Sequence, residues 1–96
     1  MSSYPARKIR GVLLAKGFQE ERSHHIVLRL VVRGKTTGIL TKISHGVSDY
    51  GDSLLGKMAR QIHLSRRELD TFIQCPMSHE DYVGILTEQG DLKAQP

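Results

Sequence analysis

The sequence contains little of what several large classes of protein require. It has one cysteine, Cys75, no tryptophan, and only 5% aromatic residues among its 96 positions. A single cysteine cannot form an internal disulfide, so the chain is not a disulfide-stabilised secreted domain, and we expect it in the cytoplasm. No apolar run reaches the about 18 residues of a transmembrane helix, and the polar, basic start is unlike a signal peptide. We therefore expect no membrane partner.

The residues that are present are typical of one small globular domain. Hydrophobic residues make up 39% of the chain and charged residues 25%, which is close to the averages for folded domains. We expect one domain over residues 1–88 and a flexible tail over residues 89–96. A domain of this size buries a modest core without a deep cavity, so we expect no cofactor.

Positive charge is concentrated in the first half of the chain. Lysine and arginine number 14 against 10 aspartates and glutamates, which gives a net charge of +4 with histidine neutral. Between Tyr4 and Lys42 the only acidic residues are Glu20 and Glu21, whereas most of the acidic residues lie in the last third of the chain, from Glu68 onward. Such a balance favours an anionic partner, above all nucleic acid, and leaves open an acidic protein.

Hydrophobic periodicity predicts an α+β fold. A period near 3.6 residues indicates helices, and a β-branched run bounded by turn residues indicates strands. Pairs of serine and an acidic residue three positions later, Ser65 with Glu68 and Ser78 with Asp81, indicate two helix starts. The predicted order is a helix over 6–16, antiparallel strands over 18–22, 24–33 and 38–44 with a turn over 34–38, a loop over 44–52, and helices over 52–63, 66–74 and after Ser78.

The first strand of the predicted hairpin separates an apolar row from a basic row. Alternate strand residues point to opposite faces, so Ile26 and Leu28 face the core. His25 then shares the outer face with Arg29 and Arg33. A histidine in that setting reaches solvent and phosphate together, and its ordinary pKa of about 6.5 allows proton exchange at neutral pH.

The same region resembles a known family. A helix, Gly17-Phe18, a short strand, Ser23-His24-His25, a hydrophobic hairpin and a helix are similar to the HicA family of bacterial toxins. The resemblance covers roughly residues 6–65. Arg22 stands where the family usually has glycine, and the chain continues beyond the helix at which compact members end.

The resemblance implies a double-stranded-RNA-binding-like fold with an extra C-terminal helical segment. It also implies a toxin-type endoribonuclease of a type II toxin–antitoxin system, which cleaves mRNA without a metal and is neutralised by an acidic, HicB-like antitoxin. In the family the second histidine of the motif is catalytic, and that position is His25 here. Neighbouring strand histidines point to opposite faces, so we expect no metal site at the motif.

Basic residues of the hairpin are the candidates for holding RNA. Arginine holds a phosphate bidentately and lysine holds it as a point charge. RNA carries its own nucleophile, the 2′-hydroxyl, so proton transfer by one histidine completes the requirements for cleavage. The candidate RNA-binding residues are Arg22, Ser23, Arg29, Arg33 and Lys42.

Two other functions remain open at this point. The scaffold can serve as a non-catalytic RNA-binding module. Alternatively, residues 58–73 resemble a helix-turn-helix DNA-binding motif, with Arg66 and Arg67 at the start of the second helix, where base and phosphate contacts are made. Against the DNA-binding function, Glu68 and Asp70 on that helix repel phosphate.

Overall fold

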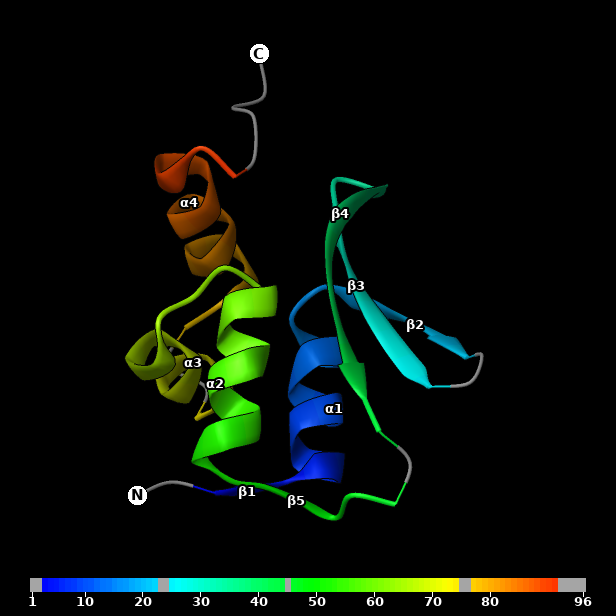
Figure 1. Cartoon of the computed structure of the whole chain (residues 1–96). Helices are drawn as coiled ribbons and strands as arrows, with labels where there is room; N and C mark the ends of the chain where they lie inside the picture. Colours follow the sequence, from blue (N-terminus) through cyan, green and yellow to red (C-terminus); the bar gives the residue numbers. More distant parts are fainter. Residues whose placement is uncertain (1–2, 23–24, 45, 75–76, 92–96) are drawn as a thin grey trace.

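Three antiparallel strands form the main sheet in the order β2 (Phe18–Arg22), β3 (Ile26–Val32), β4 (Lys35–Ile43), and helices pack on one of its faces (Figure 1). This arrangement comes from a computed structural model that describes residues 3–22, 25–44, 46–74 and 77–91. The predicted α+β class, with a helix, the sheet and then further helices, is confirmed. The elements are β1 (Tyr4–Pro5), α1 (Ala6–Ala15), β2 (Phe18–Arg22), β3 (Ile26–Val32), β4 (Lys35–Ile43), β5 (Asp49–Tyr50), α2 (Asp52–Gln61), α3 (Arg66–Ile73) and α4 (His79–Gln89).

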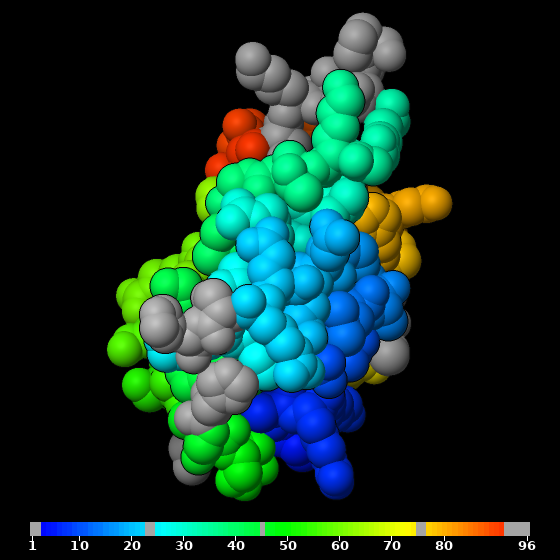
Figure 2. Space-filling view, turned by 90° about the vertical axis from the view of Figure 1, so that its right-hand side faces the viewer, coloured from blue at the N-terminus to red at the C-terminus, as the bar shows by residue number. Residues whose placement is uncertain are grey.

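Alternation along β3 sets the two faces of this sheet. Leu28 and Leu30 are completely buried on the face that the helices cover, while Val27, Arg29 and Val31 are half-buried on the other. Figure 2 looks onto this second face, where no helix lies over β2 and β3. We call it the outer sheet face. The predicted assignment of apolar and basic rows is therefore confirmed for these residues.

The turn of the β3–β4 hairpin is shorter than predicted. Only Arg33 and Gly34 lie between the strands, with φ angles of 53° and 78°, as in the two-residue type I′ turns that suit twisted hairpins. The prediction of a turn over 34–38 is wrong because β4 contains a bulge. Its pairing with β3 changes register between Arg29 and Val31, and the Thr37 hydroxyl donates to the Leu30 carbonyl there at 2.9 Å.

A two-stranded sheet of β1 and β5 was not predicted. Tyr4 lies opposite Tyr50 in this small sheet, which occupies part of the predicted loop over 44–52. The Tyr4 hydroxyl donates to Asp70 Oδ1 at 2.8 Å and accepts from Gln74 Nε2 at 2.9 Å. These hydrogen bonds tie the start of the described chain to α3.

The two predicted capping boxes begin α3 and α4. Ser65 accepts from the Glu68 backbone N–H, and Ser78 accepts from that of Asp81, with both reciprocal bonds present. α4 extends through Gln89, whose side-chain amide donates to the His63 carbonyl. The rest of the predicted tail, 92–96, lies outside the described residues. No helix in the described part of the chain is long and apolar enough to cross a membrane.

An aromatic cluster joins the C-terminal helices to the sheet. The ring centroids of Phe18 and Phe72 lie 6.2 Å apart, those of Phe18 and Tyr82 5.9 Å, and those of Phe72 and Tyr82 5.1 Å. The Tyr82 hydroxyl donates to the Ile62 carbonyl at 2.7 Å, and burial raises the pKa of this phenol. The buried cluster runs from Tyr4 to Leu86, so the segment after α2 is part of the core.

Candidate functional site

The candidate catalytic residue, His25, lies immediately before β3. Its side chain is exposed. The following residue, Ile26, pairs with Ile43 at the end of β4, so His25 is next to the chain where it leaves β4 at Ser44. Ser23 and His24 of the predicted motif lie outside the described residues. An imidazole in this position is open to a large substrate without any movement of the fold.

Lys42 is the candidate RNA-binding residue that the strand register brings toward His25. It lies opposite Val27, and directly opposed strand residues share a face, so Lys42 lies on the outer sheet face. Its side chain is exposed and has no ion pair among the described residues. Lys42 is therefore a cation available to an incoming anion.

Arg29 shares the outer sheet face but is already engaged. Its Nε donates to Glu21 Oε2 at 3.2 Å, and its Nη1 approaches the Thr37 carbonyl at 3.4 Å. Because 28% of the Arg29 side chain is exposed, the surface ion pair is accessible to a competing phosphate. Such exposed pairs contribute about 0–1 kcal/mol, so exchange of Glu21 for a phosphate costs little.

Arg22 lies on the other face of the sheet. It is opposite Ile26, just as Glu20 is opposite the buried Leu28, so Arg22 belongs to the helix side. Its Nε donates to Glu20 Oε2 at 3.0 Å, and Glu20 also accepts from Arg10 of α1. The structure thus separates Arg22 from the outer sheet face that contains Lys42.

The ion pairs of Glu20 make the stability of the fold depend on pH in the acidic range. Hydrogen bonds from Arg10 and then Arg22 lower the Glu20 pKa to about 2 from an ordinary 4.5. A carboxyl group whose pKa is lower in the folded chain than in the unfolded chain stabilises the fold at pH values above its unfolded-state pKa. We expect this contribution to disappear as the pH falls from about 4.5 to about 2.

Thermal melts of the Glu20→Gln variant between pH 2 and pH 7 test this expectation. The melting temperature of the variant should change less with pH over that range than the melting temperature of the unmodified chain. Glu88→Gln, at an exposed position of α4, is the matched control. Parallel curves for the unmodified chain and Glu20→Gln would show that the ion pairs do not contribute.

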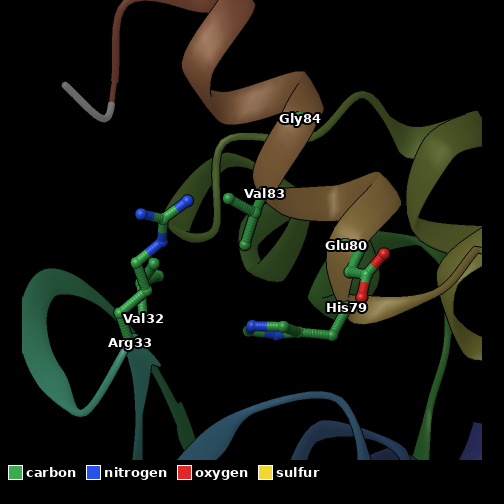
Figure 3. Close-up of a pocket in the computed structure, with 6 residues that line it drawn as sticks. All are labelled: Val32, Arg33, His79, Glu80, Val83 and Gly84. Atoms are coloured by element: carbon green, nitrogen blue, oxygen red, sulfur yellow. The ribbon is translucent and has the colours of Figure 1, made fainter. Parts of the chain in front are cut away.

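Arg33 is not on the face with His25, contrary to the sequence-based prediction. Its positive φ ends the strand alternation, and it lies in the turn at the other end of β3. Eight residues of extended chain place it roughly 25 Å from His25. It lines a pocket together with residues of α4 (Figure 3).

His79 lines the same pocket and was not among the site residues predicted from the sequence. The Ser78–Asp81 capping box predicted where α4 begins but contains no information on what that helix packs against. His45, another histidine near the predicted hairpin, lies outside the described residues. Within the described residues no group of three or more His, Cys, Asp or Glu side chains is placed to hold a metal ion.

The arginine that opens α3 is held by two carboxylates. Arg66 Nη2 donates to Asp52 Oδ1 at 2.9 Å, and Arg66 Nη1 donates to Asp70 Oδ1 at 2.7 Å. These bonds raise the pKa of Arg66 and, with the Tyr4 hydrogen bond, keep the pKa of Asp70 below its ordinary value despite burial. Arg66 thus connects α2 to α3, which weakens the argument that it reads DNA.

Comparisons with known protein families, with curated proteins and with solved structures give no match for this chain.

Proposed function

We propose that this chain is a metal-independent, HicA-like endoribonuclease that acts on mRNA in the cytoplasm. The observation that supports the proposal is the exposed His25 beside the uncovered sheet face that contains Lys42. A titratable group and a cation on one open surface suit a long polyanionic substrate. The chain's net charge of +4 favours the same class of substrate.

The proposed reaction assigns one task to each side chain. His25 accepts the proton of a ribose 2′-hydroxyl, and the resulting 2′-oxygen attacks the adjacent phosphorus. The bond between phosphorus and the 5′-oxygen breaks, and the proton passes from the imidazolium to that oxygen. Lys42 stabilises the extra negative charge on the phosphoryl oxygens.

An acidic, HicB-like antitoxin is the proposed protein partner. A partner with negative charge gains attraction from Lys42 and, after displacement of Glu21, from Arg29. The half-buried Val27 and Val31, on either side of Arg29 along β3, provide apolar surface that a protein covers better than RNA does. Binding there blocks access to His25 and so inhibits cleavage.

Cleavage of RNA in the presence of EDTA tests the enzymatic proposal. The purified chain should cut an unstructured RNA into fragments that end in a 2′,3′-cyclic phosphate, at the same rate with and without the chelator. The fragments are identified by mass. Activity that is lost in EDTA and restored by a divalent ion would contradict the metal-independent mechanism.

The Lys42→Ala variant tests the RNA-binding surface. We expect RNA affinity to fall similarly for unrelated sequences, because a lysine–phosphate contact carries no base information. The slope of log K against log salt should become less steep by about one. Lys57→Ala, exposed on α2, is the matched control, and equal slopes for the two variants would exclude the outer sheet face as the RNA surface.

A further inference from the structure

A second surface with ligand-binding character lies between the hairpin turn and α4. It is an open pocket with a volume of about 490 Å³, within the range of about 300–1,000 Å³ that is typical of small-molecule sites. Figure 3 shows the side chains that approach it from the two elements. Its lining residues are Val32, Arg33, His79, Glu80, Val83 and Gly84.

Arg33 provides a cation at one end of this pocket. Its side chain extends from the turn toward α4 in Figure 3. Among the described residues it has neither an ion pair nor a side-chain hydrogen bond, unlike Arg22, Arg29 and Arg66. The guanidinium is therefore available to a bound anion.

His79 is held in one orientation at the wall of the pocket. Its Nδ1 lies 2.7 Å from the Lys16 carbonyl oxygen, which can only accept, so Nδ1 carries a proton. Gly17 allows the ring this position, because a Cβ at Gly17 would overlap the imidazole. In the neutral ring the remaining nitrogen, Nε2, is an acceptor, and Figure 3 shows the ring directed into the pocket.

The order of groups across the pocket defines the ligand. Figure 3 shows Arg33 and Glu80 at opposite ends, with Val83 and the His79 ring between them, while Val32 lies beside Arg33. A complementary molecule has an anion at one end, an apolar middle and N–H donors at the other end. A nucleotide has these features in this order: its phosphate, the face of its base, and an amino group on the base edge.

We propose that the pocket binds one unpaired nucleotide of the RNA substrate, at a distance from the cleavage site. This inference rests on the proposed function, in which RNA is the substrate that supplies the nucleotide. The phosphate contacts Arg33, the base packs against Val83 and the His79 ring, and an amino group of the base donates to the Glu80 carboxylate. Unpaired bases are the usual targets of sequence-selective RNA recognition.

The Glu80 carboxylate at the base end predicts a preference among bases. Cytosine presents an amino group where uracil presents a carbonyl oxygen, and a glutamate carboxylate accepts from the former and repels the latter. A hydrogen bond to a charged group changes affinity by about tenfold or more. Cytidine nucleotides should therefore bind at least about tenfold more tightly than uridine nucleotides.

Titration of the full, isotope-labelled chain with CMP and UMP, followed by NMR, tests the pocket directly. CMP should cause saturable shifts in the backbone amides of Arg33 and of residues 79–84. Arg33→Asn removes the cation but keeps a residue that accepts positive φ before Gly34, so the hairpin remains folded. CMP affinity should fall about tenfold in this variant and stay unchanged in Arg60→Ala, at an exposed site on α2.

Glu80→Gln separates base recognition from simple charge attraction. Its amide both donates and accepts, so the preference for CMP over UMP should disappear. Equal binding of CMP and UMP by the unmodified chain, or unchanged CMP affinity in Arg33→Asn, would overturn the proposal. Because free mononucleotides are not cleaved, CMP binding in a chain that cannot cut RNA would support this pocket and contradict the proposed function. Cleavage without any pocket response to CMP would contradict the pocket alone.

Discussion

His25→Ala should lower the rate of RNA cleavage by about 10²–10⁴-fold, which is the usual contribution of a general acid or base. The reason is that the proposed reaction has one proton acceptor on the outer sheet face, and alanine cannot replace it. RNA affinity should change little, because Lys42 and Arg29 remain. Single-turnover cleavage at saturating protein measures the chemical step without interference from binding.

The same variant should stay folded. The His25 side chain is exposed, so its truncation leaves no cavity and should change stability by no more than about 0.5 kcal/mol. The control is His63→Asn, which removes a partly exposed histidine between α2 and α3 that pairs with Asp91 and keeps a residue that tolerates the positive φ of position 63. It should keep full activity. A His25→Ala protein that cleaves at the normal rate would show that the chain is a binding module rather than an enzyme.

Phe72→Ala should reduce the free energy of unfolding by about 3–5 kcal/mol, the range for large-to-small changes in a core. Phe72 is completely buried. It contacts Phe18 of β2 and Tyr82 of α4, and the Lys16 amine lies 4.8 Å from its ring centroid. Small domains are stable by about 5–15 kcal/mol, so this loss removes at least about a fifth of the free energy of unfolding. Urea titration of the variant and the unmodified chain measures the change in the free energy of unfolding.

Phe72→Leu is the matched comparison. Leucine keeps most of the apolar volume but not the edge-to-face ring contacts, which contribute about 0.5–1.5 kcal/mol. We expect this variant to lose clearly less stability than Phe72→Ala. A loss below about 1 kcal/mol for alanine would indicate that α3 and α4 are not packed as the aromatic cluster requires.

Local patterns predicted the elements and faces that depend on neighbours in the sequence. The alternation at Leu28 and Leu30 identified the covered face of the sheet, and serine followed by an acidic residue identified the starts of α3 and α4. Each pattern reflects a physical requirement that a few neighbouring residues satisfy. They needed no knowledge of the tertiary structure.

The missed features depend on contacts between distant residues or on single backbone angles. The bulge in β4 places polar threonines within a strand, so composition indicated a turn there. Arg33 has a left-handed backbone conformation that strand alternation cannot reveal. Its side chain therefore lies at the pocket and not at the predicted site. The β1–β5 pairing covers two residues in each strand and depends on Tyr4 reaching Asp70, 66 positions away.

The aromatic cluster has a consequence for folding during synthesis. Phe18 emerges from the ribosome early, whereas its partners Phe72 and Tyr82 emerge near the end of the chain. The hairpin and α1 can form from local contacts, but Phe18 on the inner side of β2 lacks its aromatic partners until α3 and α4 have been made. A nascent chain that stops before Phe72 therefore exposes an apolar surface to chaperones and proteases, and a chain with the complete core appears only after the last helix has been made.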